Sequence, residues 1–252
     1  MAKIQCNVIS YVLKRTVDIT VVVPTPTFGE CRKPDVSHTP KAPYPVLYLL
    51  HGAGNNQATW TGYTNVELYA EENQIVVVNM AAEDKSYVSR EGGDDFFRFV
   101  SEELPDFITG IFPVSKRVED TYIAGLSMGG FGTIVHALNH PERFCAMGAF
   151  SAATIISDRH PEWEDRFKCD WLVEHADGKK LPKIYMACGT EDFLYRNDVE
   201  YRDALIAKGA DVTWDEMEGY GHEWRFWDIE IEKFMKWLPR TDAYAADGPR
   251  KA

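Results

Sequence analysis

The feature that most constrains the fold of this chain is a short glycine-rich turn around Ser127. Residues 125–129 read Gly-Leu-Ser-Met-Gly, which is the pattern G-x-S-x-G. The apolar run 121–124 before the turn indicates a strand, and the stretch 130–139 after it is typical of a helix. A sharp turn from strand to helix strains the serine backbone and tolerates only small neighbours. We therefore predict that Ser127 projects above a sheet as a nucleophile.

A phosphate-binding turn is the alternative for the same segment. The phosphate-binding patterns G-x-G-x-x-G and G-x-x-x-x-G-K-[ST] are both missing from it. The N–H groups and the dipole of the following helix would instead face the negative oxygen that forms when a serine attacks a carbonyl. The motif therefore favours acyl transfer.

Strands and helices alternate along the rest of the chain. Continuous apolar runs, typical of strands buried on both faces, occur at 46–50, 75–78, 121–124, 146–150, 183–187 and 212–214, and helical patterns at 66–72, 95–112, 130–139, 197–208 and 224–237. This order predicts an α/β fold with a mostly parallel central sheet flanked by helices. Earlier, residues 15–23 alternate apolar and polar side chains, which predicts a half-buried antiparallel strand that pairs with 4–12.

The length of 252 residues suits a single domain, and no linker or repeat divides it. We assign residues 1–238 to this domain and expect 239–252 to be a polar, weakly ordered tail. Residues 151–182 interrupt the alternation as an insertion. Because they follow the carboxyl end of a strand, we expect them to cover the catalytic edge of the sheet as a lid or cap.

The acid and the base of a serine hydrolase of this kind should follow the nucleophile in the loops after later strands. Asp192 lies after the strand 183–187, and Glu191 beside it is the rival acid. The shorter Asp192 is preferred because it must accept the Nδ1–H of a histidine from a fixed position. His222 follows the last strand, beside Gly221, where the base is needed.

Two backbone N–H groups should stabilise the oxyanion. One is that of Met128, directly after the nucleophile, and the other comes from the loop 50–56 after an earlier strand. Ala53 is our choice in that loop, with Gly54 next. A plain glycine-rich turn is the alternative. However, four independent features, namely this loop, Ser127, Asp192 and His222, fall in the required order along the chain.

Charge and composition exclude other classes of function. There are 27 Lys and Arg against 39 Asp and Glu, a formal charge of −12, which argues against nucleic acid and against anionic membrane surfaces. Five scattered cysteines without a C-x-x-C pair, and no apolar leader, indicate reduced thiols in the cytoplasm. His136 and His140 have a spacing that can bind zinc, but Ala137 fills the place of the glutamate in H-E-x-x-H, so no metal is expected.

The aromatic side chains are the main candidates for substrate contacts. An acyl pocket or a platform for sugar or phenolic groups could come from Trp60, Trp163, Trp171, Trp224 and Trp227. Of these we place Trp60, Trp163 and Trp224 in the substrate site. Core packing is the alternative, and helical spacing favours it for Trp227 and Trp237. In the insertion, Trp163 and Trp171 also suit a lid or a contact between copies of the chain, so a homo-oligomer stays open.

With these residues in place, the chain resembles the esterase D-like branch of the α/β-hydrolases over residues 46–237. This branch contains tributyrin-type esterases, S-formylglutathione hydrolases, and acetyl and feruloyl carbohydrate esterases. The resemblance rests on Leu-Leu-His-Gly at 49–52, the glycine-rich run 125–130, His-Pro-Glu-Arg-Phe at 140–144, Cys-Gly-Thr-Glu-Asp at 188–192 and Gly-His-Glu-Trp at 221–224. It implies the same triad, Ser127, Asp192 and His222, with Ala53 and Met128 as the oxyanion hole.

The function expected from these residues is hydrolysis of short-chain acyl esters, acetyl to butyryl, through an acyl-enzyme and without a cofactor. The substrate is a small-molecule ester, with acetylated sugars and feruloyl esters as candidates. An acyltransferase with the same triad, an S-formylglutathione-hydrolase-like thioesterase and a non-catalytic binding protein are the alternatives. Residues 53–55 read Ala-Gly-Asn where S-formylglutathione hydrolases typically have Leu-Thr-Cys, which disfavours that thioesterase activity.

Overall fold

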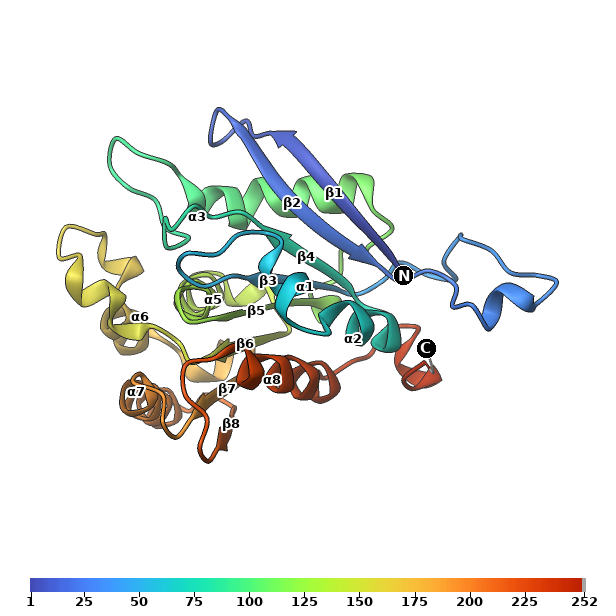
Figure 1. The fold of residues 1–252 in the computed structure, drawn as a ribbon. Helices are drawn as coiled ribbons and strands as arrows, with labels where there is room; N and C mark the ends of the chain where they lie inside the picture. The colour runs from blue at the N-terminus through green and yellow to red at the C-terminus, as the bar shows by residue number, and fades with distance from the viewer. Residues whose placement is uncertain (251–252) are drawn as a thin grey trace.

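The computed structural model describes residues 1–250 and contains one eight-stranded sheet (Figure 1). The strand order is β1-β2-β4-β3-β5-β6-β7-β8. The first two strands run antiparallel and the remaining six are parallel to one another, as predicted. The strands are β1 (Ala2–Ile9), β2 (Thr16–Val23), β3 (Val46–Leu50), β4 (Val76–Met80), β5 (Thr121–Leu126), β6 (Ala146–Phe150), β7 (Lys183–Gly189) and β8 (Val212–Met217).

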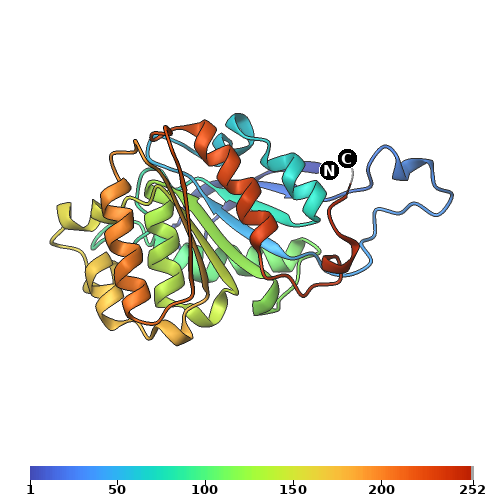
Figure 2. The ribbon, with the colours of Figure 1, turned by 90° about the horizontal axis from the view of Figure 1, so that it is seen from below.

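Helices cover both faces of the sheet (Figure 2). They are α1 (Thr59–Tyr63), α2 (Val66–Asn73), α3 (Phe96–Arg98), α4 (Leu104–Ile111), α5 (Met128–Asn139), α6 (Cys169–His175), α7 (Tyr195–Ala207) and α8 (Trp224–Trp237). Side chains of α1, α2 and α8 share one apolar core, and those of α3 to α7 share the other. The layered α/β arrangement predicted from the sequence is therefore confirmed.

The central strand β3 shows why these apolar runs do not alternate with polar residues. Val46, Tyr48 and Leu50 belong to the core on the α5 side, whereas Leu47 and Leu49 belong to the core on the α8 side. Successive side chains of a strand point to opposite faces. Because both faces are covered by helices, every position of β3 must be apolar.

The second strand is buried more deeply than its alternating sequence predicts. It pairs antiparallel with β1 and β4, and Val17, Ile19 and Val21 share one face, as expected. However, Thr20 and Val22 on the opposite face are also fully buried. Val22 joins the core that α2 contributes to, so only the start of β2 has an exposed face.

The single helix predicted over 95–112 is interrupted by a wider turn. The structure has α3, then a π-helical turn at Phe99–Glu103, then α4. Pro105 explains the change, because proline has no N–H to donate to a carbonyl four residues earlier. The carbonyl of Ser101 accepts a hydrogen bond from the guanidinium of Arg143 instead.

The insertion 151–182 extends the helical layer on the α5 side of the sheet. Its helix α6 lies against α5, and its Phe167 and Leu172 are buried in the same core. In Figure 1 α6 lies to the left of α5 and above α7. The first residues of the insertion, 151–153, lie directly after β6 and reach the turn around Ser127. A lid role for the insertion stays a prediction.

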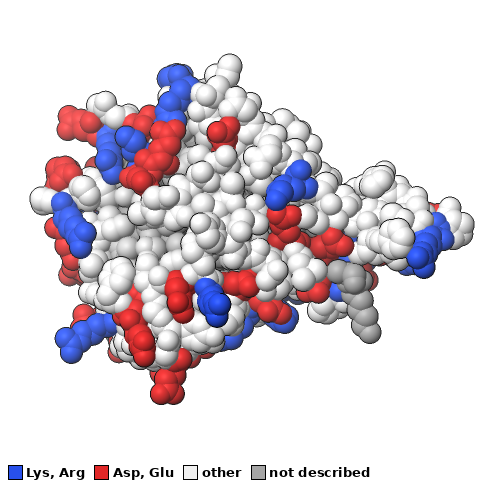
Figure 3. All heavy atoms as spheres, in the orientation of Figure 1, with Lys and Arg blue, Asp and Glu red and all other residues white. Residues whose placement is uncertain are grey.

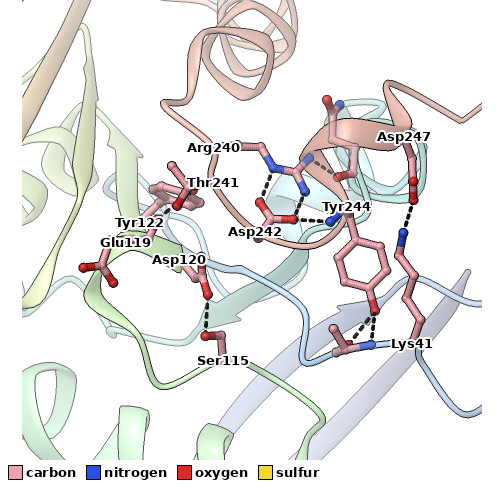
Figure 4. Close-up of polar contacts among 12 residues, drawn as sticks. Lys41, Ser115, Glu119, Asp120, Tyr122, Arg240, Thr241, Asp242, Tyr244 and Asp247 are labelled. Carbon is pink, nitrogen blue, oxygen red and sulfur yellow. Dashed lines mark hydrogen bonds and ion pairs between the residues drawn. The ribbon is translucent and has the colours of Figure 1, made fainter.

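The segment 239–250 packs against the body of the protein and is not the loose tail that its polarity predicted. Tyr244 is buried, stacks on Tyr44 with ring centroids 4.7 Å apart, and donates to the carbonyl of Ala42 at 2.5 Å. Figure 4 shows the hydrogen bonds of the Tyr244 hydroxyl and the ion pair of Arg240 with Asp242, whose shortest separation is 2.7 Å. A buried aromatic ring and a paired carboxylate thus fix this segment.

Both ends of the described chain meet at the end of α2. The amino group of Met1 pairs with Glu71 at 2.6 Å, and the N–H of Arg250 donates to the carbonyl of Glu72 at 2.7 Å. Nearby, the loop 24–43 projects from the body (Figure 1). Since β4 begins just after α2, this meeting point lies at the amino edge of the parallel strands.

Charged side chains of both signs are interspersed over the face in Figure 3. Lys and Arg stand singly or beside Asp and Glu, and the centre of this face is largely uncharged. Within residues 1–250, none of the helices has the length and apolar character needed to cross a membrane. All five cysteines are free thiols.

Candidate active site

The turn around Ser127 has the strained geometry that its sequence predicted. Ser127 lies at φ 53° and ψ −117°, immediately before α5, which begins at Met128. A Cβ on Gly125 would lie 2.9 Å from the Cβ of Leu50, and one on Gly129 would lie 2.7 Å from the carbonyl oxygen of His51. Only glycine fits at either position, so these two residues allow β5, α5 and the end of β3 to meet.

Three side chains from different loops form a continuous hydrogen-bonded line. The Ser127 Oγ lies 3.0 Å from the Nε2 of His222, and the Nδ1 of His222 lies 2.9 Å from the Oδ2 of Asp192. Asp192 follows β7, and His222 lies between β8 and α8. Glu191, the rival acid, is exposed, so only Asp192 among the two candidate acids faces the histidine.

Asp192 is held as an ionised acceptor. Its side chain is almost fully buried, and this burial raises its pKa. Hydrogen bonds from His222 at 2.9 Å and from the N–H of Leu194 at 2.9 Å outweigh burial, so the pKa lies below its usual value. An ionised Asp192 accepts the Nδ1–H of His222, which leaves Nε2 as the acceptor for the Ser127 hydroxyl.

Two aromatic rings contact His222 on different sides. Trp227 meets it edge to face, with ring centroids 4.9 Å apart, and Phe193 lies at 4.7 Å. Trp227 is buried in the core, as predicted, but Phe193 is 72% exposed. No sequence pattern singled out Phe193, although its place directly after Asp192 was a usable signal.

The loop after β3 lies beside the serine. A Cβ on Gly52 would lie 3.4 Å from the Cβ of Ser127. The N–H of Gly54 donates to the Oδ1 of Asp84 at 2.7 Å and is therefore engaged elsewhere. Within residues 1–250, no hydrogen-bond acceptor pairs with the N–H of Ala53 or of Met128. These are the two donors that the sequence predicted for the oxyanion, and of the two candidates in the loop, Ala53 is the one left free.

A set of buried hydrogen bonds supports this loop from below. The Nε2 of His51 accepts the N–H of Ala82 at 3.0 Å, and the hydroxyl of Tyr87 donates to the carbonyl of His51 at 2.8 Å. Burial lowers the pKa of His51, so the ring is neutral and can accept. The sequence carried no signal for these partners because they come from the irregular segment after β4.

Trp60 does not line an open substrate site, which is where its sequence position had suggested it would lie. It is fully buried, its Nε1 donates to the carbonyl of Leu50 at 3.0 Å, and its ring packs edge to face on Phe150 and Trp224. A completely buried indole needs a partner for its N–H, and the end of β3 supplies it. Trp60 therefore supports the loop after β3 from within the core.

The other two predicted substrate residues are placed differently. Trp224 is half-buried, and Tyr63 stacks on it with ring centroids 4.9 Å apart. Trp163 packs on Phe131, one turn into α5 from Ser127. It also lines a cavity of about 670 Å³ beside Arg90. Substrate contact by Trp163 and Trp224 stays a prediction.

His136 and His140 are both involved in packing. His136 is fully buried, lies 3.0 Å from the carbonyl of Tyr87, and has a pKa lowered by burial to about 3. Both imidazole rings stack on Phe97. Over residues 1–250, no group of three or more His, Cys, Asp or Glu side chains is arranged to hold a metal ion.

Comparison with known proteins identifies the protein family to which this fold and this site geometry belong. The model of the Esterase family matches residues 26–238, and the chain belongs to this family. Together with the eight-stranded sheet and the structural neighbours, the match places it in the esterase D-like branch of the α/β-hydrolases. The protein is a serine hydrolase that acts on carboxylic ester bonds.

Individual relatives agree with this class. An acetyl esterase from Caldicellulosiruptor saccharolyticus is 30% identical, covering 96% of this chain and 99% of the relative. The fluorophosphonate-binding serine hydrolase FphF from Staphylococcus aureus superposes with a TM-score of 0.83 at 26% identity, over 95% of this chain and 99% of that one. The S-formylglutathione hydrolase FrmB from the same organism gives 0.81 at 26% identity, over 94% and 98%.

Proposed function

We propose that the protein hydrolyses short-chain acyl esters through Ser127, with His222 as the base and Asp192 as the residue that orients it. The observation that carries the proposal is the line Ser127–His222–Asp192, with separations of 3.0 and 2.9 Å. These distances lie within the range that proton transfer to a general base requires. The nucleophile and its base are already in hydrogen-bond contact.

The reaction proceeds in two steps. The Ser127 Oγ attacks the ester carbonyl carbon while its proton passes to the Nε2 of His222, and the N–H groups of Ala53 and Met128 bind the oxyanion. His222 then gives the proton to the departing alcohol, which leaves an acyl ester on Ser127. Water hydrolyses this ester by the reverse roles, and Asp192 keeps the Nδ1–H of His222 in place throughout.

Acetyl to butyryl esters are the proposed substrates. A curated relative at 30% identity is named an acetyl esterase, which supports a small acyl group. The net charge of −12 disfavours anionic substrates and favours neutral esters. Acetylated sugars and feruloyl esters fit the same chemistry, and the exposed ring of Phe193 beside His222 offers an apolar surface to the group that leaves.

Replacing the nucleophile tests the mechanism. Ser127→Ala should lower kcat for p-nitrophenyl acetate by at least about 10⁴-fold, because the covalent route is lost. The variant should also fail to react with a fluorophosphonate probe, while its circular dichroism spectrum and Tm stay close to those of the wild type. Near-normal turnover by a folded Ser127→Ala protein would refute the proposal.

A substrate panel tests the specificity. We expect p-nitrophenyl esters to give the highest kcat/KM between two and four acyl carbons, and a maximum at eight or more would contradict a small acyl site. Acetylated xylo-oligosaccharides, methyl ferulate and S-formylglutathione distinguish the candidate natural substrates. Partition of the acyl-enzyme toward an added alcohol in preference to water would identify an acyltransferase.

A further inference from the structure

Phe193 places a large apolar ring in an exposed position beside the proposed base. Its side chain is 72% exposed, and its ring centroid lies 4.7 Å from that of His222. Single exposed apolar side chains are common on protein surfaces. This ring differs from most of them because it contacts a side chain that is hydrogen-bonded to the nucleophile, Ser127.

The backbone on both sides of Phe193 is fixed by hydrogen bonds. The N–H of Asp192 donates to the carbonyl of Gly189 at 3.0 Å, and the N–H of Leu194 donates to the Oδ1 of Asp192 at 2.9 Å. The N–H of Tyr195, at the start of α7, donates to the carbonyl of Asp192 at 3.0 Å. Asp192 and Leu194 are both buried. The exposed ring thus projects from a rigid turn, so a ligand that covers it orders little additional chain.

The other aromatic contact of His222 is closed to a ligand. Trp227 meets the imidazole edge to face but is buried in the core. Its indole also packs edge to face on Trp224, with ring centroids 5.3 Å apart. Of the two rings that contact His222, Phe193 is therefore the one that a substrate can cover.

The proposed mechanism brings the alcohol part of the ester to the same histidine. The Nε2 of His222 lies 3.0 Å from the Oγ of Ser127, and it gives its proton to the departing alcohol oxygen. Because that oxygen must come within about 3 Å of Nε2, the first carbon atoms of the alcohol part lie beside the imidazole. The acyl part remains bonded to Ser127, with its oxygen at the N–H groups of Ala53 and Met128. The alcohol part is therefore the part of the substrate that reaches Phe193 first.

We propose that Phe193 determines specificity for the alcohol part of the ester, and that the natural substrate carries there a neutral ring with a flat apolar face. The proposal rests on the Ser127–His222–Asp192 mechanism proposed above. The face of an arene and the C–H face of a pyranose sugar offer the same chemistry to Phe193, because stacking removes the apolar area of both partners from water. The net charge of −12 disfavours an anionic ring.

Two acetate esters with equal numbers of carbon atoms in the alcohol part isolate the effect of the ring. Benzyl acetate and heptyl acetate both release a primary alcohol, but only the benzyl group is flat. In the wild-type enzyme we expect kcat/KM to be at least about threefold higher for benzyl acetate, which is within the range that an aromatic pair contributes. Phe193→Ala should lower kcat/KM by about three- to tenfold for benzyl acetate and by less than about twofold for heptyl acetate.

An acetylated methyl xyloside replaces the arene by a sugar. A loss of kcat/KM in Phe193→Ala for this ester would identify a pyranose as a ring that Phe193 recognises. A loss for benzyl acetate alone would identify an arene. Both results support the proposal, and together they separate its two sources.

Hydrolysis of the acetyl-enzyme provides an internal control. All these esters leave the same acetyl group on Ser127, and its hydrolysis no longer involves the alcohol. The deacetylation rate, measured in the steady state that follows a burst of p-nitrophenol from p-nitrophenyl acetate, should change by less than about twofold in Phe193→Ala. The rate of labelling by a fluorophosphonate should also be kept, since the fluoride that leaves has no ring. A ring that merely held His222 in place would lower both rates.

Two further variants complete the design. Phe193→Tyr keeps an aromatic ring and should retain kcat/KM for benzyl acetate within about twofold of the wild type. Phe28→Ala removes a similarly exposed ring, 79% exposed, from the loop 24–43 and should leave kcat/KM for both acetates unchanged. Because both rings are exposed, each variant should keep a Tm close to that of the wild type.

The proposal is overturned by a wild-type preference for heptyl acetate, by equal losses for benzyl and heptyl acetates, or by unchanged kcat/KM for both ring esters in Phe193→Ala. A parallel fall in deacetylation and in fluorophosphonate labelling would overturn it as well, because Phe193 would then act on His222. Turnover of p-nitrophenyl acetate by Ser127→Ala would instead overturn the proposed mechanism itself.

Discussion

The contact between Asp84 and Gly54 gives a sharp test of how the oxyanion loop is held. The Oδ1 of Asp84 accepts the N–H of Gly54 at 2.7 Å. The N–H of the preceding residue, Ala53, is the proposed donor to the oxyanion. Residue 54 is a glycine at φ 72°, so no side chain restricts the backbone there. Replacement of Asp84 by Ala removes the anchor and lets Ala53 sample other orientations.

The magnitude follows from the exposure of this contact. A hydrogen bond to a charged group is worth about 1.5 to 3 kcal/mol, but Asp84 is exposed and screened by water. We therefore take about 1 kcal/mol as the lost preorganisation, which is roughly a fivefold fall in kcat. Loss of an entire oxyanion donor costs about 10² to 10³ in kcat and sets the upper limit.

The assay is kcat and KM for p-nitrophenyl acetate with Asp84→Ala and Asp84→Asn side by side. Asparagine keeps a carbonyl oxygen to accept the N–H of Gly54 and tolerates the φ of 55° at this position, so it should retain most of the activity. The reasoning is refuted if Asp84→Ala has wild-type kcat, or if the Asn variant loses as much kcat as the Ala variant.

Two further predictions concern stability. Gly129→Ala puts a Cβ 2.7 Å from the carbonyl oxygen of His51 and should destabilise the protein by about 1 to 3 kcal/mol in urea unfolding, whereas Gly62→Ala, with open space around the new Cβ, should not. Asp198→Asn should raise Tm, and more at pH 8 than at pH 5. Because the folded-state pKa of Asp198 is raised, its contribution to stability is complete below the unfolded-state pKa of about 3.9 and is lost as pH rises; thermal-shift curves at both pH values that show no gain at pH 8 would contradict this.

The residues of the proposed triad could be found from sequence because each follows a strand. Ser127 lies in a local motif that dictates its own backbone, and Asp192 and His222 occupy loops whose order along the chain is fixed by the parallel sheet. Parallel strands bring the loops after their carboxyl ends to one edge. The meeting of these three side chains thus follows from topology and needs no knowledge of side-chain packing.

Other features depended on tertiary contacts that no local pattern encodes. Trp60 was expected to touch substrate, but its ring is fully buried in the core and its N–H donates to the carbonyl of Leu50. The segment 239–250 looks polar, yet Tyr244 has a partner in Tyr44, two hundred residues earlier. The same holds for Asp84, whose role depends on a hydrogen bond to another loop.

The meeting of Met1 and Arg250 at the end of α2 has a practical consequence for handling this enzyme. Ser127 lies at the carboxyl edge of the parallel strands, and the two ends of the described chain lie at the opposite edge. A fusion partner or a surface attachment at either end would therefore point away from arriving ester. A short peptide joining the ends would also allow new termini to be opened in the projecting loop 24–43, with the edge that carries Ser127 left intact.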